Sequence, residues 1–427
     1  MIGYEIEAKN DTLYILLDKT SDPDKEMPHL RSWKLVQGDA SEIESFAFQM
    51  NVNHVGFNEI GLKNTYISVK NLATKKEEFY GRVIQVTSRM DSDGTIYKEI
   101  TCAGAKDFLK DSVQFYRKPK EYALSAWITE LLDRHNSMMD SYRKIYPGTI
   151  SVSGFTGTEE MYTSCETTWE VLQDLVEEYG GEINIRSSGG THYLDYVDKF
   201  GNAQGPEIKL ADNIVDIEFK QDRGGIITRL YPIGAIIKKE TEKTDSEEPK
   251  DDESEEETEK TPSAKATDTT EENEEKKEPE ERRYGIADAN GGVNYIEDAA
   301  GIAAYGRFAG VQIWDDVTDP EKLLQKGRAW LNRQKIFESI TANVLDLSVI
   351  DSAYQPLERF NTYVVSHSLL GIRQNMRIVK KTITSDAPHK PQITFGDKGR
   401  TLADAVKQNS KNTRRLAKRI DKAISEV

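Results

Sequence analysis

Short runs of alternating apolar and polar residues dominate the first hundred positions of the chain. β-Branched and aromatic residues are frequent in these runs, which favours β-strands with one buried face. Turn signals such as DSDG at 91–94 separate the runs, and short strands at this spacing are typical of a small barrel or sandwich. The predicted strands are 13–17, 45–52, 66–69, 79–87 and 95–102.

The next hundred residues change to a helical period. Apolar residues recur every three or four positions in 123–139, and again from 167 or 168 to the glycine pair at 180–181. Two strands follow at 182–186 and 192–196, joined by the hairpin sequence SSGG. The pattern predicts a small α+β domain.

A second β region begins at 207 and is interrupted before it is complete. Its strand-like runs are 208–237, 335–350, 362–367, 376–384 and 392–395. The gap after the first run is far longer than an ordinary connection, which indicates an insertion within this domain. The later part of the insertion contains an amphipathic helix, predicted at 317–335 with Asp319-Pro320 as its start signal.

The charge of the chain is concentrated in one acidic segment of low complexity. Residues 241–283 hold 19 Asp and Glu against 8 Lys and Arg, which accounts for most of the net charge of −16. The segment has no aromatic residue and almost no aliphatic one, so it cannot bury enough apolar surface to offset the entropy of ordering. We therefore predict a disordered acidic insert at 239–283. Outside it, no basic stripe favours nucleic-acid binding as a primary role.

The last 27 residues carry the pattern of a coiled coil. Apolar and small polar residues recur at alternating spacings of four and three, which is the a/d seam. The seam positions are Leu402, Val406, Asn409, Thr413, Leu416, Ile420, Ala423 and Val427. Such a narrow seam favours a parallel bundle of identical helices, and one amphipathic helix packed on its own chain is the alternative. The seam does not set the number of helices.

The sequence contains no recognisable catalytic or metal-binding motif. Its six histidines form neither HExxH nor HxxxH, and there is no nucleophile elbow or Walker loop. His192 and Asp195 lie three apart in a predicted strand and should point to opposite faces. Cys165 precedes a helix N-terminus, which is only a weak signal for a reactive thiol. No catalytic residue, metal site or cofactor is predicted.

The chain is expected to fold in a bacterial cytoplasm. It has only two cysteines, Cys102 and Cys165, which lie on different predicted elements and suggest neither a disulfide framework nor a zinc site. The N-terminus shows no secretory signal, and no apolar run is long enough to span a membrane.

The order of several stretches resembles the siphophage and prophage tail-tip baseplate hub family. The stretches are FYGRVIQVTSRMDSDGTIYKEITCAGAKDFLKDS at 79–112, TTWEVLQDLVEEYGGEINIR at 167–186, IVDIEFKQDRGGIITRLYPIGA at 214–235, ITANVLDLSVI at 340–350 and IVKKTITSDAPHKPQITFGDKGRTLADAV at 378–406. That family includes the N-terminal regions of tail-associated lysins and of prophage endopeptidase tail proteins. It shares its fold with the baseplate hub of contractile phages.

The resemblance implies a mixed β and α+β fold with two similar small β-barrels, an intervening α+β domain, a helical part and a C-terminal coiled-coil helix. The expected domains are a first β-barrel at 1–104, the α+β domain at 105–206, a second β-barrel at 207–238 and 336–396, the acidic insert at 239–283, a helical insert at 284–335 and the coiled-coil helix at 397–427.

The function implied by the resemblance is that of a non-enzymatic structural hub at the tail tip of a virion. A homotrimer would place six barrels in a ring that docks on the hexamer of the distal tail protein and closes or gates the tail tube. The tape-measure protein is a further implied partner, as are receptor-binding or lysin proteins. DNA would only pass through the lumen during ejection into the host cell.

Two alternatives stay open. A cell-wall (peptidoglycan) hydrolase rests on the family label alone, since the residues that would carry the activity are not found. A module that binds host-surface carbohydrate would use the aromatic residues Phe115, Tyr116 and Tyr122 in the stretch QFYRKPKEY, although such a stretch is more often a linker packed between domains.

Overall fold

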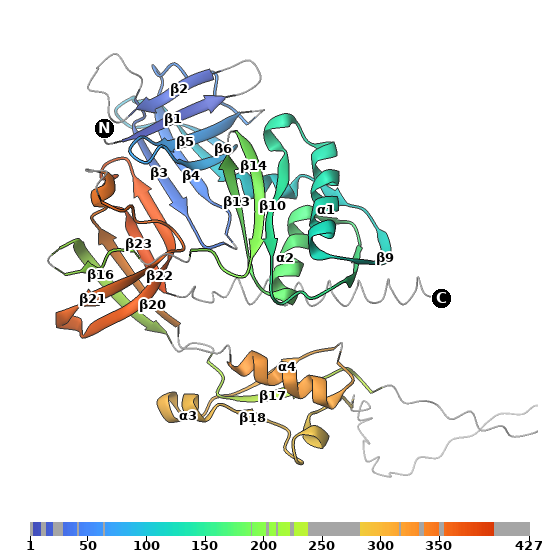
Figure 1. Cartoon of the computed structure of the whole chain (residues 1–427). Helices are drawn as coiled ribbons and strands as arrows, with labels where there is room; N and C mark the ends of the chain where they lie inside the picture. Colours follow the sequence, from blue (N-terminus) through green and yellow to red (C-terminus); the bar gives the residue numbers. More distant parts are fainter. Residues whose placement is uncertain are drawn as a thin grey trace, which may run out of the picture. The chain divides into compact units, whose positions relative to one another are not determined.

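The structure of this chain is a computed structural model in which two compact units are found, Met1–Asp222 with Phe337–Val427, and Arg223–Ile336 (Figure 1). The described residues are 3–9, 14–19, 29–40, 42–62, 65–188, 190–201, 205–210, 212–222, 226–237, 282–315, 317–332, 337–349 and 354–396.

One large sheet organises the larger unit. Its 13 strands follow the order β16-β20-β23-β22-β3-β4-β7-β6-β5-β1-β2, with β15 and β21 beside this path. Every pairing along this order is antiparallel. The strands are β1 (Tyr4–Lys9), β2 (Tyr14–Lys19), β3 (Ser32–Gln37), β4 (Ser45–Asn51), β5 (Tyr66–Asn71), β6 (Glu77–Met90), β7 (Ile96–Gly104), β15 (Ile208–Lys209), β16 (Ile214–Asp222), β20 (Phe337–Val344), β21 (Thr362–His367), β22 (Ile372–Thr384) and β23 (Gln392–Gly396).

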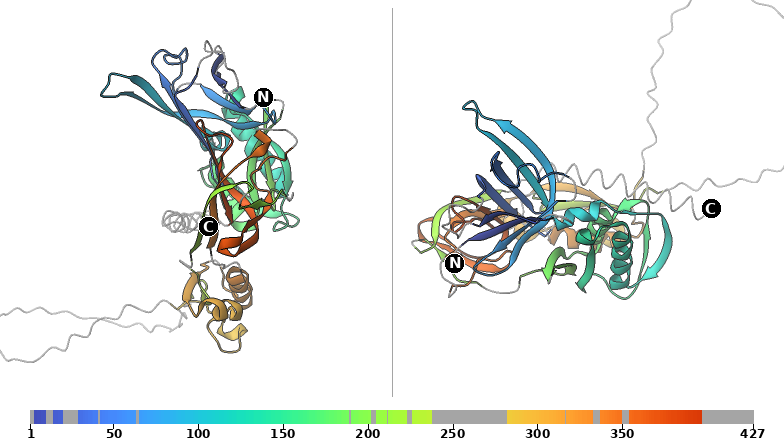
Figure 2. Two further views of the ribbon diagram at one scale, coloured as in Figure 1. Left: turned by 90° about the vertical axis from the view of Figure 1, so that its left-hand side faces the viewer. Right: turned by 90° about the horizontal axis from the view of Figure 1, so that it is seen from above.

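The N-terminal half of this sheet curls around a hydrophobic core. Its side chains alternate between the two faces of the sheet, and one face forms the core: Phe46, Phe48 and Met50 of β4 are buried, whereas the residues between them face outward. Trp33 of β3 meets the ring of Tyr4 edge-on, with the centroids 5.3 Å apart. The hairpin of β6 and β7 is longer than its neighbours and projects from the sheet (Figure 2).

The C-terminal half of the sheet surrounds a second core, which includes Ile340, Tyr363 and Phe395. β22 belongs to both halves, because its first residues pair with β21 and its last four pair with β3. The predominantly β character expected from the sequence is therefore present. Two separate barrels were expected, whereas the hydrogen bonds join the strands into one sheet that wraps two cores.

An α+β region lies between these halves in the sequence. Its helices are α1 (Leu124–Met138) and α2 (Thr168–Tyr179), and α1 packs against a three-stranded sheet of β10 (Ile145–Ser151), β14 (Thr191–Val197) and β13 (Glu182–Ser188). The stretch containing Phe115 and Tyr116 is not a simple linker, because strands form on both sides of it. These are β8 (Val113–Gln114) paired with β12 (Glu166–Thr167), and β9 (Arg117–Tyr122) paired with β11 (Glu159–Thr163).

The start of α2 is fixed by a capping box. The Thr167 hydroxyl accepts a hydrogen bond from the Glu170 amide at 3.2 Å, and the Glu170 carboxylate accepts one from the Thr167 amide at 3.1 Å. Gly180, at φ 77°, follows the last helical residue. Both ends lie where the sequence predicted them.

The smaller unit contains β17 (Arg229–Ile233), β18 (Ile296–Glu297), β19 (Ala309–Ile313), α3 (Ala299–Tyr305) and α4 (Pro320–Asn332). β17 was expected in the second barrel, but it pairs here with β18 and β19. The reason is local: the strand packs against α4, whose Gly327 lies so close to Pro232 and Ile296 that a Cβ would approach within 3 Å of both. The sequence predicted a helical insert at 284–335, whereas this unit contains three strands as well as two helices.

Five short 3-10 helices complete the described elements: η1 (Ala105–Lys110), η2 (Ser141–Arg143), η3 (Ala287–Ala289), η4 (Leu347–Val349) and η5 (Ser368–Leu370). The expected disordered insert at 239–283 lies outside the described residues except for its last two positions. The expected coiled-coil helix at 397–427 lies wholly outside them.

Candidate functional site

The seam expected to join copies of the chain stays a prediction. All of its positions lie outside the described residues: Leu402, Val406, Asn409, Thr413, Leu416, Ile420, Ala423 and Val427. The described residues offer three other candidates. These are two serine–histidine contacts, a groove on the large sheet and a junction of charged side chains.

The first serine–histidine contact joins Ser112 and His135. The Ser112 hydroxyl lies 2.7 Å from His135 Nδ1, and His135 Nε2 lies 3.1 Å from the carbonyl oxygen of Arg143. Because a carbonyl oxygen only accepts, Nε2 carries the proton and Nδ1 accepts from the hydroxyl. This is the arrangement of a nucleophile and its base. Both side chains are nevertheless 0% exposed, so no substrate reaches them.

The hydrogen bonds around this pair indicate a structural role. Thr168 Oγ1 lies 2.6 Å from the Ser112 hydroxyl and accepts a hydrogen bond from Gln114 Nε2 at 2.7 Å. Gln114 also donates to the carbonyl oxygen of Leu131 at 3.0 Å. The network ties α1, β8 and the first turn of α2 together. Burial lowers the pKa of His135, which keeps the imidazole neutral.

The second contact, between Ser187 and His192, lacks a third member. His192 Nδ1 lies 2.9 Å from the Ser187 hydroxyl, while its ring packs against Tyr80 with the centroids 4.0 Å apart. Asp195 instead accepts hydrogen bonds from Arg186 Nε and from the Thr149 amide, each at 2.7 Å. His192 and Asp195 therefore have different partners, as expected for residues on opposite faces of a strand.

The two cysteines occupy contrasting environments, and both are free thiols. Cys102 is fully buried in β7, and burial raises the pKa of its thiol, which disfavours the reactive thiolate. Cys165 is exposed in a turn, where its backbone has a left-handed φ of 64°. Within the part of the chain that the structure describes, no group of three or more His, Cys, Asp or Glu could hold a metal ion. No helix in that part is long and apolar enough to cross a membrane.

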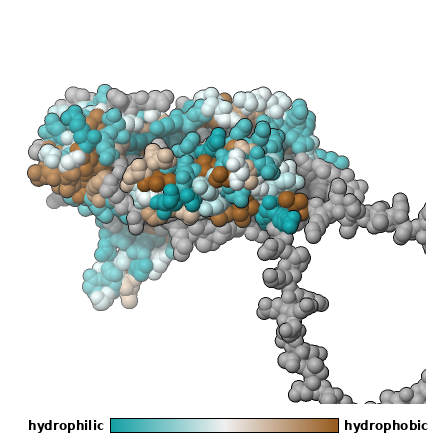
Figure 3. All heavy atoms as spheres, turned by 90° about the horizontal axis from the view of Figure 1, so that it is seen from below, coloured by the Kyte–Doolittle hydropathy of each residue, from teal (hydrophilic) through white to brown (hydrophobic). Residues whose placement is uncertain are grey.

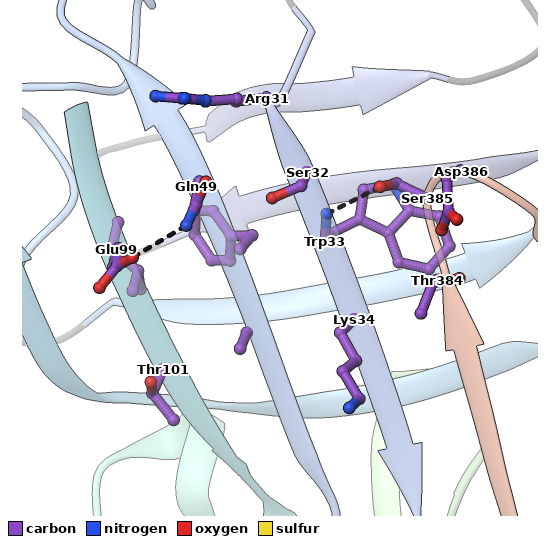
Figure 4. Close-up of a pocket in the computed structure, with 13 residues that line it drawn as sticks. Arg31, Ser32, Trp33, Lys34, Gln49, Glu99, Thr101, Thr384, Ser385 and Asp386 are labelled. Carbon is purple, nitrogen blue, oxygen red and sulfur yellow. Dashed lines mark hydrogen bonds between the residues drawn. The ribbon is translucent and has the colours of Figure 1, made fainter. Parts of the chain in front are cut away.

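The second candidate is a shallow groove of about 500 Å³ on the large sheet (Figure 4). Its polar lining comes from β3, β4, β7 and the residues after β22, on the side opposite the core. The side chains that shape it include Ser32, Lys34, Gln49, Glu99, Thr101 and Asp386. Gln49 Nε2 donates to Glu99 at 2.8 Å, and the Trp33 amide donates to the Ser385 hydroxyl at 3.1 Å.

The chemistry of this groove suits a weak polar contact. Its charged residues balance, with Arg31 and Lys34 against Glu99 and Asp386. Glu99 is also engaged by Arg89 at 2.6 Å. A groove of this kind can hydrogen-bond to a neighbouring chain but concentrates no charge. The sequence reading missed it because β3 was not among the predicted strands.

The third candidate is a junction where three parts of the larger unit meet. Arg377 of β22 makes a bidentate pair with Glu182 of β13, with N–O distances of 2.5 and 2.6 Å. The same guanidinium donates to the carbonyl oxygens of Phe360 at 3.0 Å and Phe200 at 3.2 Å. Phe360 has a left-handed φ of 72°, an uncommon conformation for a bulky residue that its surroundings must hold.

Arg359 extends the junction to the N-terminal half of the sheet. It pairs with Glu44 at 2.6 Å and donates to the carbonyl oxygen of Gly38 at 3.0 Å. Nearby, the buried Lys106 donates to the carbonyl oxygens of Ala40 at 2.9 Å and Glu42 at 3.1 Å. Burial lowers the pKa of Lys106 to about 8, although the Coulombic attraction of Glu44 opposes this.

No signal in the sequence could have found the junction, because its members come from widely separated segments. Each arginine or glutamate reads alone as an ordinary surface residue. Only the fold brings them within hydrogen-bonding distance and buries them.

Comparison with known proteins gives a consistent result. Residues 202–406 match the model of a family described as prophage endopeptidase tail. No curated protein sequence matches the chain. Among solved structures, the 43 kDa tail protein of prophage MuSo2 from Shewanella oneidensis is 12% identical with a TM-score of 0.57, and the match covers 92% of this chain and 98% of that one.

Two further tail proteins share the fold at similar distance. A prophage tail protein from Listeria monocytogenes is 13% identical with a TM-score of 0.51, over 95% of this chain and 98% of that chain. A tail protein from Neisseria meningitidis is 10% identical with a TM-score of 0.54, over 94% and 99%. The resemblance to prophage tail proteins that the sequence indicated is thereby confirmed.

Proposed function

We propose that this chain, which matches the prophage endopeptidase tail family over 202–406 and has the fold of prophage tail proteins, is a structural component of a phage or prophage tail tip. The observation that carries the proposal is the extent of the match. The fold is shared with the Shewanella tail protein over 98% of that protein, and not merely in one domain.

In this proposal the chain acts as a homotrimeric hub. Each chain contributes two hydrophobic cores wrapped by one sheet, so that three chains present six similar units to the hexamer of the distal tail protein. The seam at 402–427 would hold the three chains together on the axis. The tape-measure protein would contact the ring from the side of the tube.

The proposed mechanism is mechanical. The junction around Arg377 and Arg359 ties the N-terminal half, the α+β region and the C-terminal half, so the larger unit of each subunit should move as a rigid body. The tube would open for DNA by rotation of whole subunits. The groove on the large sheet, with its balanced charges, would offer DNA little attraction.

A mass measurement tests this proposal. The purified full-length chain should have three times its chain mass of 48.3 kDa, and it should form a larger ring when mixed with distal tail protein. Antibody labelling should place it at the tail tip of particles. A monomer at micromolar concentration that forms no ring with distal tail protein would contradict the hub.

A peptidoglycan hydrolase is the first alternative, favoured only by the description of the matching family and by the Ser112–His135 contact. Because this pair is sealed from solvent, we expect no release of muropeptides from host cell walls by the purified protein. Release that is abolished by Ser112→Ala or Cys165→Ala would establish the enzyme instead.

A carbohydrate-binding role is the second alternative. Phe115 and Tyr116 are 59% and 48% exposed, and exposed neighbouring aromatic side chains are typical of sugar-binding surfaces. Binding of the full chain to host cells, lost in Phe115→Ala/Tyr116→Ala and competed by wall polymer, would support it. We expect no such binding, because Arg134 lies over the Phe115 ring at 5.9 Å and occupies one face of it.

A further inference from the structure

The core-facing side of the β6–β7 hairpin continues past the core that it helps to form. Phe48, Ile100 and Val86 lie opposite one another across β4, β7 and β6, and all three pack in the core. Two residues further along comes Lys98, which lies over the Phe57 ring at 4.3 Å and donates to the carbonyl oxygen of Phe57. This contact closes the end of the core.

A third row lies beyond that closure, and we call it the hairpin row: Val52, Ile96 and Met90. Ile96 and Met90 are cross-strand partners, and the Val52 amide donates to the carbonyl oxygen of Ile96 at 3.1 Å. Positions two apart on a strand share a face, so the row continues the apolar side of the sheet. Its members are 51%, 41% and 71% exposed, and no described part of the chain covers them.

A second exposed apolar feature, which we call the apolar turn, is the pair Leu369 and Leu370. It lies in η5, between β21 and β22, and its residues are 84% and 52% exposed. A hydrogen bond stabilises the conformation of this turn: His367 Nδ1 accepts from the Leu370 amide at 3.2 Å. Figure 3 shows hydrophobic side chains gathered at the left-hand edge, the side on which Figure 1 labels β21 of the larger unit.

The strand register places these two features at opposite ends of the same sheet. Thr384 pairs with Lys34, Lys34 with Ala47, and Ala47 with Thr101, which defines one row across four strands. From this row the hairpin row lies five residues away in one direction, or ~17 Å at the rise of a strand. The apolar turn lies beyond the other end of β22, ~40 Å away in the opposite direction.

The charges beside the two features are complementary. The turn that ends the hairpin carries Asp91 and Asp93, next to Met90. Arg31 already engages Asp91 at 3.5 Å, whereas Asp93 accepts a hydrogen bond from the Thr95 amide at 2.9 Å. Arg373 follows the apolar turn, and its side chain is 76% exposed with only a loose contact of 4.0 Å to Glu207. Asp93 beside one apolar feature and Arg373 beside the other carry opposite charges, which favours their association.

We propose that the hairpin row of one copy binds the apolar turn of a second copy. Since the two features cannot meet within one chain, the contact joins different surfaces of different copies, head to tail. Contacts of this kind close into a ring when the rotation between copies permits it. The inference rests on the proposed hub, because it names the surfaces by which the hub would assemble.

Disulfide trapping tests the contact. In a Cys165→Ser background, Ile96→Cys and Leu369→Cys are made in separate chains of different tag length, mixed, and oxidised with copper phenanthroline. A cross-linked dimer of one chain of each kind is expected. Arg89→Cys, next to Met90 but on the other face of the strand, should give no cross-link with Leu369→Cys.

A binding measurement accompanies the trapping. Ile96→Asp should weaken self-association by about tenfold or more, because it places a charge in a desolvated apolar contact. At concentrations low enough for both proteins to be monomeric, its melting temperature should match that of the natural chain, since Ile96 lies outside the core. Asp93→Lys should weaken association as well, and Arg373→Glu in the same chain should restore it.

The outcomes separate this inference from the proposed hub. A trimer that forms normally in Ile96→Asp, or that cross-links only Ile96→Cys to itself, overturns the inference and leaves the hub intact. A chain that stays monomeric and forms no ring with distal tail protein overturns both.

Discussion

Arg377 shows how much a single residue can hold together. Its guanidinium bonds to Glu182 and to two carbonyl oxygens, and its side chain is only 14% exposed. Arg377→Ala should lower the free energy of unfolding by about 2–4 kcal/mol, because Glu182 would be left mostly buried without its cation. Urea denaturation measures the loss.

Lys76→Ala is the matched control for this substitution. Lys76 pairs with Glu358 at 3.0 Å, but the two side chains are 57% and 43% exposed. Solvent screens such a pair, so its loss should change stability by less than about 1 kcal/mol. If both substitutions lowered the free energy of unfolding equally, the junction would contribute no more to stability than an exposed ion pair.

His135 gives the fold a dependence on pH. Its pKa is lowered by burial, so between that pKa and the ordinary value of 6.5 the unfolded chain binds a proton that the folded chain does not. Stability is therefore fully present above pH 6.5 and falls as the pH drops below it. The stability advantage of the natural protein over His135→Gln should shrink between pH 7.5 and pH 5.

Denaturation midpoints of the two proteins across that range check this expectation. His192 is also buried with a lowered pKa, so both proteins should lose some stability in acid. Only the difference between the denaturation midpoints of the two proteins measures the contribution of His135. A difference that stays constant with pH would contradict the assignment of a neutral, buried imidazole.

Among the elements, α2 depends most clearly on its own sequence. Thr167→Ala removes the hydroxyl that caps the helix and should cost about 1 kcal/mol in thermal or urea unfolding. Thr129→Ala in the middle of α1 is the control, because its hydroxyl only bonds back to the carbonyl oxygen of Ser125 at 2.8 Å. That change should be neutral or slightly stabilising.

The elements that the sequence predicted are those with local signals. α1 has a regular apolar period, α2 has in addition a capping box and a glycine stop, and the β13–β14 hairpin has a turn sequence. All three form where expected. β1 and β3 were not predicted, although each alternates buried and outward-facing residues and has the same length as β2, which was. β17 was assigned to the wrong domain because a strand pattern does not reveal which strand it pairs with.

The junction and the groove lie beyond any such local signal. The junction brings residues 38, 44, 182 and 359–377 together, and nothing in the spacing of these positions indicates a contact. The groove needs both the presence of β3 and its position between β4 and β22. Sites made by tertiary pairing follow from the fold and not from the period of the sequence.

At the scale of the whole molecule, the smaller unit is an insertion at the tip of a hairpin. Asp222 of β16 and Phe337 of β20 are paired residues, so the chain leaves and returns at neighbouring points of the large sheet. Replacing 223–336 by Asn-Gly should therefore give an ordinary hairpin and a folded larger unit of equal or greater stability.

Size-exclusion chromatography, circular dichroism and urea denaturation of the shortened chain check this expectation. Ile340→Ala, in the β20 core position, should destabilise the shortened and the full chain equally. A shortened chain that aggregates, or in which Ile340→Ala has no effect, would show that the large sheet needs the smaller unit to form.

The architecture of the larger unit could be foreseen only in part. Composition and period indicated a mostly β protein with an α+β region, but not that the last four residues of β22 pair with β3. That one pairing converts two expected barrels into a single sheet. It depends on geometry between segments more than three hundred residues apart in the sequence.

In the smaller unit, the two chain segments that flank the acidic insert are paired with each other, and this has a practical consequence. Ile236 and Arg283 form a bridge, and the Ile237 amide donates to the carbonyl oxygen of Arg282 at 2.8 Å, so the chain exits and re-enters at one point. Doubling the length of chain between these ends costs only about 0.6 kcal/mol in closure entropy. A fluorescent protein or a gold-binding peptide could therefore be inserted between 240 and 280, and electron microscopy of labelled particles would then show where the smaller unit lies in an assembled tail.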